Sequence, residues 1–476
     1  MHEVITISLG QRANHTATQF FNCQQELLSE QGERLNDPSI FLNPTIDKLS
    51  KTVSYAPRSL IWDAKNGTGS LGTYQYSHTR DYYFGQDNES DENHNVIMTH
   101  PAIPKSQYQQ ALDSGSFPLP KLTTENTKYW SDYSKLVYSP RSFNILKDWY
   151  HDVCNPNKPD FEKLETKKFD NFDVGYQEFN ESYLTDFFDG NFHSELEQCD
   201  TLQGFNLIMD MDSGWGGFTT ALVQELRNEL PKKTFFNWGY NENDPLTAKH
   251  TKFQEARFSR STLPLVENKI KAMAYMSEDC DLMVPLYADS KLSNWEQGGL
   301  TCKYIDAISS VLSLSHNADR KSMDFVKDCF TFGDTSKCFV SSFMDENETD
   351  DSYFARIMPF RNHPKDSNEQ HVFSECSIIR GIVGSDLESS KSKKLLRTYP
   401  YHPSDTIPRE LSERKSFSLK YKTTEICRNV FTHYHEIVTK YIRNTSDREE
   451  LKDRLATLAS QYEYGWYDDE DSSDDL

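Results

Sequence analysis

Two stretches of the sequence repeat the order of buried strand, glycine turn and amphipathic helix. Residues 4–9 are mostly apolar or β-branched, Gly10 interrupts them, and apolar side chains then recur at helical spacing. The same order returns at residues 204–211, followed by the turn DSGWGG, a helix that ends before Pro231 and a strand at residues 234–238. Repeated units of this kind require right-handed crossovers between parallel strands, with helices on both faces. The first half of the chain is therefore predicted to be α/β, with a doubly wound parallel sheet.

Three segments between these units have other patterns. A short strand is predicted at residues 59–62, before Asp63 and the glycine-rich NGTGS. Residues 74–128 are polar and show no sustained period, which predicts a long surface excursion with little structure. Aromatic side chains in residues 180–199 recur mostly in steps of three or four, which predicts a strongly amphipathic helix.

The pattern changes after about residue 300. A predicted helix at residues 301–315 precedes strand-like segments such as KCFVSSFM, FARIMPF and HVFSECSIIRGI, which indicate a mixed sheet. Two helices follow, the first at residues 425–443, and the second opening with Ser446 and Glu449 at the spacing of a capping box. The run DDEDSSDDL is too highly charged to pack. It is typical of a solvated end, with a docking tail as the alternative.

The amino-acid composition argues against several classes of protein: nucleic-acid binders, disulfide-rich or zinc-ribbon proteins, and membrane-spanning proteins. The chain has 51 Lys and Arg against 73 Asp and Glu, a formal net charge of -22, which repels nucleic acid and anionic lipid. Its nine cysteines form no C-x-x-C pair, which argues against a disulfide framework or a zinc ribbon and favours a reducing compartment. No apolar run approaches the roughly 18–20 residues that span a bilayer, and the first ten residues resemble no secretory or mitochondrial leader. We expect an intracellular protein whose association with any organelle is peripheral.

Three glycine-containing turns follow predicted strands, at residues 10–14, 63–69 and 212–217. In a doubly wound sheet such turns meet at the carboxyl ends of the strands, where helix N-termini favour phosphate. Each turn alone is weak evidence, because glycine at a strand-to-helix turn often serves only the backbone.

Taken together, the turns resemble those of tubulin. GQRAN at residues 10–14 is similar to the tubulin GQCGN, PRSLIWDAKNGTGSL at residues 57–71 to PRAVLVDLEPGTMDSV, and CDTLQGFNL at residues 199–207 to CDCLQGFQL. LVEN at residues 265–268 matches a further tubulin segment. LASQYEYGWYDDED resembles the end of tubulin, where a final helix runs into an acidic tail.

An insertion at about residues 74–173 separates the chain from tubulin itself. Its segment WSDYSKLVYSPRS, at residues 130–142, resembles the Misato family of tubulin-related proteins, and the chain is identified as a member of that family. The resemblance implies an α/β, tubulin/FtsZ-like fold with an N-terminal doubly wound parallel sheet and a second mixed α+β domain. The implied parts are residues 1–300, the tubulin-like GTPase-fold domain with its insertion; residues 301–424, the mixed-sheet domain; residues 425–465, C-terminal helices; and residues 466–476, a disordered acidic tail.

Tubulin and bacterial FtsZ bind GTP, with the segment GGGTGSG around the phosphates, and hydrolyse it when a neighbouring subunit adds an acidic residue. The resemblance therefore implies a nucleotide site at the three turns, with GTP as the candidate cofactor. From the residues themselves we predict no catalytic residue and no metal ligand. The implied site residues are Gly10, Gln11, Arg12, Asn14, Asp63, Gly67, Thr68, Ser213, Gly214, Gly216 and Gly217.

The phosphate turn departs from the tubulin pattern. Asp212 replaces the first glycine, and its carboxylate opposes a phosphate by a few kcal/mol in a partly dry site. Trp215 replaces the threonine, Gly217 takes the serine position and Phe218 takes the last glycine. Arg12 adds a cation in the first turn, so we expect it to pair with Asp212 and fill the pocket in place of a phosphate.

Three functional hypotheses follow. The first is a non-hydrolysing tubulin-fold protein that acts through protein partners. The Misato resemblance implies a role in mitochondrial distribution, morphology and mitochondrial DNA inheritance, at the outer mitochondrial surface or in the cytoplasm. The second is a GTP-binding protein that assembles like tubulin or with it, which Gln11, Asn14, Asp63 and Thr68 favour. The third is a folding factor that shares cytosolic chaperone machinery with tubulin.

The altered phosphate turn favours the first hypothesis, and with it a protein without enzymatic activity. No segment with the activating Gly-x-x-Asn-x-Asp pattern of tubulin and FtsZ occurs between residues 309 and 347, which points the same way.

Overall fold

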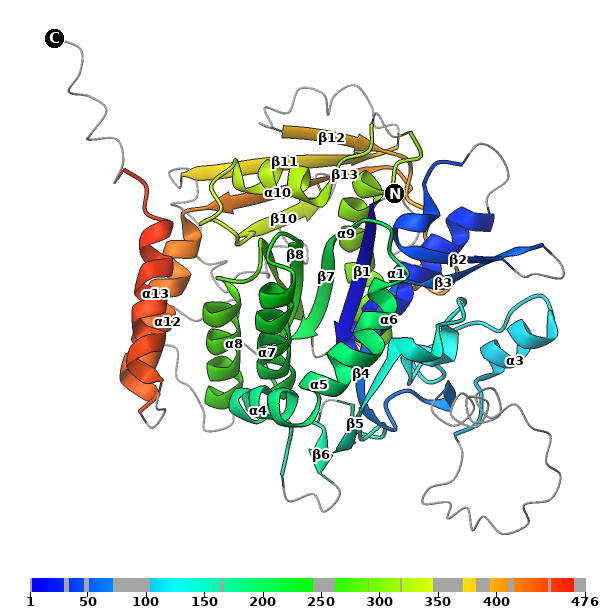
Figure 1. The fold of residues 1–476 in the computed structure, drawn as a ribbon, viewed down its shortest axis with the longest axis horizontal. Helices are drawn as coiled ribbons and strands as arrows, with labels where there is room; N and C mark the ends of the chain where they lie inside the picture. The colour runs from blue at the N-terminus through cyan, green and yellow to red at the C-terminus, as the bar shows by residue number, and fades with distance from the viewer. Residues whose placement is uncertain are drawn as a thin grey trace.

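Seven strands form one sheet in the first part of the chain (Figure 1). In spatial order they are β6 (Phe161–Glu162), β5 (Phe143–Tyr150), β4 (Ser59–Lys65), β1 (Glu3–Leu9), β7 (Leu202–Asp210), β8 (Thr234–Glu242) and β9 (Leu282–Ala288). Neighbouring strands run parallel, apart from β5 and β6. The four strands predicted from the sequence are β1, β4, β7 and β8, and β4 and β8 continue beyond their predicted ends.

The structure is a computed structural model that describes residues 2–29, 34–46, 51–71, 103–156, 158–162, 167–242, 262–289, 291–316, 319–345, 371–381, 394–409, 415–443 and 447–465.

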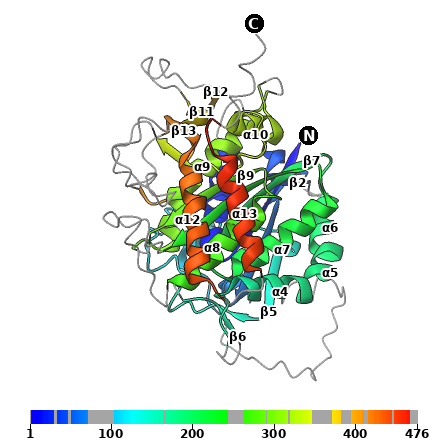
Figure 2. The same cartoon turned by 90° about the vertical axis from the view of Figure 1, so that its left-hand side faces the viewer.

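The strand order reverses between β1 and β7. The chain leaves β1 toward β4 and leaves β7 toward β8, so right-handed crossovers put α1 (Gln11–Ser29) and α7 (Gly214–Glu229) on opposite faces. α1 packs with α9 (Asn294–Leu312), whereas α7 packs with α4 (Phe172–Ser182) and α8 (Leu263–Met276) (Figures 1 and 2). This is the predicted doubly wound arrangement, in which a ligand site lies at the carboxyl ends of the strands beside the reversal. The predicted domain boundary at residue 300 falls inside α9.

Aromatic side chains fill the space between β4 and the helices on the α7 face. The ring of Trp62 lies 4.8 Å from that of Phe218 and 5.1 Å from that of Phe187, centroid to centroid. The helix predicted at residues 180–199 is divided here into the end of α4, α5 (Leu184–Asp186), a π-helical segment (Phe187–Phe192) and α6 (His193–Leu196). The wider π turn brings residues five apart onto one face, so Phe187 and Phe192 are both buried, with ring centroids 5.6 Å apart.

Part of the predicted insertion is well structured. Residues 72–102 lie outside the described residues, but the remainder of the stretch predicted to have little structure contains α3 (Gln107–Ser114), so that prediction is wrong there. Tyr108 and Leu122 form a small separate core with Tyr133 and Trp295. These partners lie far apart in the sequence, so the hydrophobic periodicity of a single segment does not predict their contact. The sequence also missed the hairpin of β2 (Leu42–Ile46) and β3 (Val53–Pro57).

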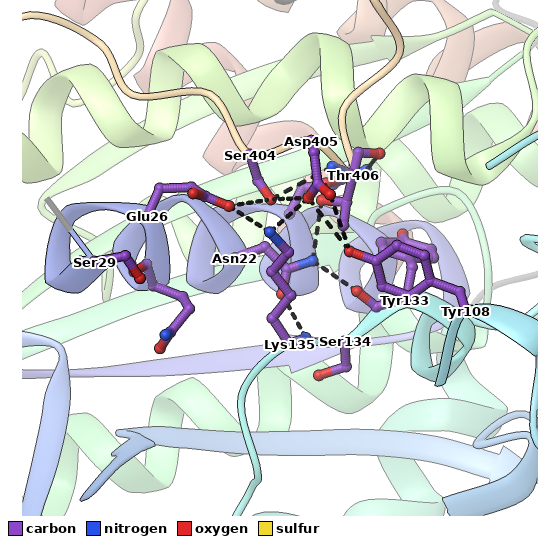
Figure 3. Close-up of polar contacts among 12 residues, drawn as sticks. Asn22, Glu26, Ser29, Tyr108, Tyr133, Ser134, Lys135, Ser404, Asp405 and Thr406 are labelled. Atoms are coloured by element: carbon purple, nitrogen blue, oxygen red, sulfur yellow. Dashed lines mark hydrogen bonds and ion pairs between the residues drawn. The ribbon is translucent and has the colours of Figure 1, made fainter. Parts of the chain in front are cut away.

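A polar cluster joins the insertion to α1 and to the loop before the last strand (Figure 3). Lys135 points between Glu26 and Asp405 and pairs with both carboxylates, and the Tyr108 hydroxyl donates to Asp405 at 3.3 Å. Burial disfavours the charge of Lys135, but its hydrogen bonds to Asp405 and Glu26 outweigh this and raise its pKa. Asn22 of α1 donates to Thr406 at 3.1 Å. Side chains from three distant parts of the chain thus hold the insertion in place.

A second, mixed sheet follows, as predicted. Its strands, in spatial order, are β10 (Ser342–Asp345), β13 (Phe417–Thr424), β11 (Val372–Arg380) and β12 (Lys394–Thr398). β11 and β12 run parallel and the other pairs antiparallel, and α10 (Met323–Thr331) packs on β11 and β13. The predicted strand FARIMPF lies outside the described residues.

Two helices, α12 (Ile426–Tyr441) and α13 (Arg448–Gln461), lie side by side next to α8 (Figure 2). Ser446, where the capping box was predicted, lies outside the described residues; the described helix has Asp447 as its N-cap residue, and the Asp447 side chain makes no capping hydrogen bond. Arg448 instead donates to the carbonyl of Ile442 and so fixes the turn between the two helices. The predicted acidic tail, residues 466–476, lies outside the described residues. Among the helices that the structure describes, none is long and apolar enough to cross a membrane.

Candidate functional site

The turns after β1 and β7 touch at the carboxyl ends of the two strands. Gly10 ends β1 with a φ of +92°, a conformation that glycine adopts without strain. A Cβ placed on Gly10 would lie 2.8 Å from Oδ2 of Asp210 and 3.1 Å from Cδ1 of Trp215. This close approach requires glycine, and it brings two of the three predicted turns into one site.

Arg12 links the two turns by ion pairs. Its Nε lies 2.8 Å from Oδ1 of Asp210, and its Nη2 lies 2.5 Å from Oδ1 of Asp212, so the predicted pair with Asp212 is confirmed. Burial raises the pKa of Asp210 to about 7; Arg12 opposes the rise and the neighbouring carboxylate of Asp212 adds to it. The guanidinium is therefore committed to two aspartates of its own chain.

Trp215 occupies the space above Gly10. It is buried, and its indole Nε1 donates to Oδ2 of Asp160 at 3.0 Å. The other oxygen of Asp160 lies 2.8 Å from Nδ1 of His151. Burial disfavours the charged imidazole, but the hydrogen bond and charge of Asp160 outweigh this and raise the pKa of His151. A carboxylate from the predicted insertion thus holds the indole in place.

The first three N–H groups of α7 are all used within the chain. Gly214 donates to the carbonyl of Phe169 at 2.9 Å, and the amides of Trp215 and Gly216 donate to the side chain and the carbonyl of Ser213. Asn268 of α8 reinforces this turn by donating to the carbonyl of Asp212 at 3.1 Å. These amides are the donors that a phosphate at this helix N-terminus would take.

The glycines of α7 also have a packing role. A Cβ on Gly217 would lie 1.8 Å from the carbonyl oxygen of Phe172, and one on Gly175 of α4 would lie 1.7 Å from that of Gly214. Gly216 faces the carbonyl of Met211, 2.6 Å from where its Cβ would stand. The predicted phosphate glycines therefore allow α4 and β7 to approach α7 closely.

The third turn is built around Asp63. Its oxygens accept hydrogen bonds from Gln11 at 2.7 Å, Asn14 at 3.2 Å and the Trp130 indole at 2.9 Å. Burial raises the pKa of Asp63 to about 6, although His151 and these donors oppose the rise. A Cβ on Gly67 would lie 2.1 Å from an oxygen of this carboxylate.

The polar residues of the third turn are thus bonded to one another, and Thr68 is buried beside them.

A cavity of about 560 Å³ remains at this edge of the sheet. Of the predicted site residues, Gln11, Arg12 and Ser213 line it, whereas Asn14, Asp63, Gly67 and Thr68 lie outside its lining. Its charged lining combines more acids than bases: Asp160, Asp170, Asp210, Asp212 and Asp289 against Arg12, Lys158, Lys168 and His151. Such a lining is less favourable for a polyanion than a phosphate site normally is.

Sequence reasoning missed several residues that build the site: Trp130, His151, Asp160, Phe169, Asp210 and Asn268. Most of these residues belong to the predicted insertion, which the sequence does not connect with the three turns. Asp210 lies near the end of the strand predicted at residues 204–211. Its closeness to Asp212 in the sequence is the one feature that could have identified it as a site residue.

Comparisons with known proteins agree with this architecture. A family model described as the tubulin domain matches residues 119–314, and one described as the Misato Segment II tubulin-like domain matches residues 2–114. Protein DML1 of Kluyveromyces lactis is 41% identical over the whole of both chains. The chain belongs to the Misato/DML1 family of tubulin-like proteins. Protein DML1 of Eremothecium gossypii and of Debaryomyces hansenii are 40% and 30% identical, again over the whole of both chains.

Family membership clarifies the predicted insertion of this Misato/DML1 protein. The tubulin-domain match begins at residue 119, and β5 pairs in parallel with β4 from residue 143. The later part of the predicted insertion therefore belongs to the tubulin-like sheet, and it supplies Asp160, which accepts from Trp215, and the Phe169 carbonyl, which accepts from Gly214.

Proposed function

We propose that this Misato/DML1 protein is a tubulin-fold scaffold that acts through protein partners and does not hydrolyse GTP. Its role is in mitochondrial distribution and partitioning, mitochondrial morphology and the inheritance of mitochondrial DNA. One observation carries the proposal: the Gly214 N–H, at the start of α7, donates to Phe169 of the same chain beneath a buried Trp215.

The charges beside this turn support the same conclusion. A triphosphate would meet the buried carboxylates of Asp210 and Asp212, and Arg12 could turn to the phosphates only by breaking its ion pairs with both. Breaking a buried pair in this way costs about 3–5 kcal/mol. The residues present therefore fit GTP poorly.

The mitochondrial role rests on family resemblance, and its place of action is the outer mitochondrial surface and the cytoplasm. The partners we propose are proteins, with tubulin or cytosolic chaperone machinery as the candidates. Affinity capture from cells, followed by mass spectrometry, tests this. Enrichment of tubulin or chaperonin subunits is expected, and the absence of both would remove these partners from the proposal.

Replacing Ser213 by Asp tests whether a phosphate is needed. Aspartate caps a helix as well as serine does, and its charge suits the positive end of α7, so the fold is retained. The same charge would repel a phosphate. In cells that lack the native chain, Ser213→Asp is expected to restore mitochondrial distribution and mitochondrial DNA to the wild-type level.

The control for this complementation is Ser293→Asp, at the start of α9, where serine also caps the helix. If Ser213→Asp accumulates normally but loses mitochondrial DNA while Ser293→Asp does not, the chain needs an anion at α7 and the proposal fails.

A second candidate is a GTP-binding protein that assembles like tubulin or with it. The cavity of about 560 Å³ favours it, because it lies at the strand ends beside Gln11 and Arg12. Equilibrium binding of labelled GTP to the purified chain separates the two candidates. Stoichiometric retention, with hydrolysis per chain that rises with protein concentration, would establish the second candidate; no retention would exclude it.

A further inference from the structure

The hairpin of β2 and β3 is amphipathic, and it extends away from the main sheet (Figure 1). Strand residues alternate between two faces, and residues directly opposite each other in an antiparallel pair share a face. One face is apolar apart from a tyrosine hydroxyl and consists of Leu42, Pro44, Ile46, Val53, Tyr55 and Pro57. The other face is mostly polar and consists of Asn43, Thr45, Ser54 and Ala56. The hairpin therefore has an apolar face of its own.

The base of this apolar face is fixed to the body of the protein. Leu42 is fully buried in the main core, Pro57 is buried, and Tyr55 packs against the core. On the other face, Asn43 donates a hydrogen bond to Gln198, just after α6. Apolar packing and a hydrogen bond thus hold the hairpin at its base.

The outer end of the apolar face is open to solvent. Ile46 is 65% exposed and Val53, directly opposite it, is 49% exposed. Pro44, on the same face, is exposed as well. Single exposed apolar residues are common, but these side chains are neighbours on one face and continue its buried part. We call Pro44, Ile46 and Val53 the hairpin tip.

Two cations accompany the hairpin tip. Lys51 is exposed two residues before Val53, and Arg34 is exposed with its Nη1 3.5 Å from the hydroxyl oxygen of Tyr55. Among the described residues, neither cation has a carboxylate within 4.0 Å. Residues 42–46 and 51–57 contain no acid, and the intervening DKLS has no net charge. The hairpin is thus basic in a chain whose net charge is -22.

The hairpin also carries its tip away from the acidic body of the protein. Salt screens the interaction of exposed charges that lie more than about 8 Å apart at physiological ionic strength. A strand of five residues is about 17 Å long, so the acids near the base of the hairpin are largely screened at its tip. The charge at the tip is therefore set mainly by Lys51 and Arg34.

The size of the hairpin tip favours a membrane over another protein. A stable protein–protein interface buries about 800 Å² on each partner, much more than three side chains supply. A peripheral segment associates with a bilayer through a few inserted apolar side chains and through cations that attract anionic headgroups. An apolar end beside two unpaired cations has the chemistry of such a segment.

We propose that the hairpin tip inserts into the surface of a membrane that contains anionic phospholipid. Ile46 and Val53 enter the boundary between headgroups and acyl chains, and Lys51 and Arg34 contact lipid phosphates. The contact is peripheral and reversible, since only a few side chains take part. This inference gives the proposed place of action, the outer mitochondrial surface, a physical basis, and it rests on that proposed function.

Flotation of the purified full chain with lipid vesicles tests the proposal. The wild-type chain is expected to float with vesicles of phosphatidylcholine and phosphatidylserine. The bound fraction should fall at least about fivefold with phosphatidylcholine alone or at high salt, because the attraction of the two cations is then lost. Absence of flotation with the anionic vesicles would overturn the proposal.

Two variants locate the contact on the hairpin. Replacing both Ile46 and Val53 by Thr keeps β-branched side chains, and so the strands, but should lower the bound fraction about tenfold. Lys51→Asn removes a charge at a residue whose φ of +55° asparagine tolerates, and should lower it about fivefold. The controls are Val137→Thr and Lys121→Asn, at exposed positions elsewhere, which should bind like the wild type. Unchanged flotation of the double variant would contradict insertion of the tip.

Two further outcomes would assign the hairpin tip to another occupant and overturn the proposal. A wild-type dimer that becomes monomeric in the double variant, in analytical ultracentrifugation, would assign the tip to a second copy. Binding to isolated mitochondria that is lost after protease treatment of their surface would assign it to a protein. None of these outcomes changes the complementation by Ser213→Asp, so failure of the lipid contact is distinguishable from failure of the proposed function.

Discussion

The turn after β1 and the turn after β7 lie at the same edge of one sheet, yet they depart from tubulin to different degrees. The first keeps Gln11 and Asn14, and both donate to Asp63, which also accepts from Trp130. The second is rebuilt around Trp215, held by Asp160 from the insertion. In both turns, side chains are bonded to other groups of the same chain, and both turns also line the cavity of about 560 Å³.

Under the proposed function, the comparison shows how the residues of a nucleotide motif can persist for structural reasons. In the first turn Gln11 and Asn14 both donate to Asp63, which gives each a structural reason to remain, whereas Oε1 of Gln11 is buried without a hydrogen-bond partner among the described residues. In the second turn the Trp215 indole packs against Gly10, and the Phe169 carbonyl accepts from the Gly214 N–H. Four predictions, in order of decreasing effect, test whether both turns are structural.

Replacing Trp215 by Ala should have the largest effect. The side chain is buried against Phe169 and Phe218, so its loss leaves a cavity and removes the indole donor from Oδ2 of Asp160. We expect the free energy of unfolding to fall by about 4 kcal/mol, measured by urea denaturation. Val137→Ala, at an exposed position, should stay within about 0.5 kcal/mol. A loss below about 1 kcal/mol at Trp215 would mean that the indole does not fill the turn.

Replacing Arg12 by Met should cost about 3 kcal/mol at pH 8, because the two buried carboxylates of Asp210 and Asp212 then lose the guanidinium that pairs with both. Protonation of Asp210 relieves part of this repulsion, so the loss should shrink toward pH 5. Chemical denaturation at both pH values measures it, with Lys147→Met, at an exposed ion pair, as the control. A pH-independent loss would contradict the proposed pairing.

Replacing Asp210 by Asn should change how stability depends on pH. The folded chain holds the proton of Asp210 more tightly than the unfolded chain, since burial raises its pKa from 3.8 to about 7. Unfolding therefore releases a proton in this window, and this residue's contribution to stability falls as the pH rises. Asn removes the effect, so the decline between the two values should be smaller by about 2 kcal/mol. Asp186→Asn, at an exposed position, should leave the decline unchanged.

Replacing Ser213 by Ala should have the smallest effect, a loss of about 1 kcal/mol, because its hydroxyl caps α7. Ser293→Ala at the start of α9 should cost a similar amount. Thermal denaturation compares the two. If Ser213→Ala is neutral or stabilising while Ser293→Ala is not, then Ser213 is kept for a ligand and the two turns differ in purpose.

The sequence predicted those features whose signal is local. Strand, turn and helix followed from short-range periodicity in residues 4–9 and 204–211, and the opposite charges of Arg12 and Asp212 led to the right pair. Trp130 and Asp160 could not be placed, because they reach the turns across long sequence separations. The π-helical segment Phe187–Phe192 was not predicted for another reason: aromatic residues spaced three or four apart are equally consistent with an α-helix.

The central claim is that the first N–H groups of α7 and the Arg12 guanidinium are bonded within the chain, so that the chain takes up no nucleotide. Native mass spectrometry of the purified full chain, in the presence of GTP and Mg²⁺, tests it most directly. The account predicts the mass of the chain alone, for the wild type and for Ser213→Asp equally. A wild-type chain that carries one guanine nucleotide, which Ser213→Asp loses, would contradict it.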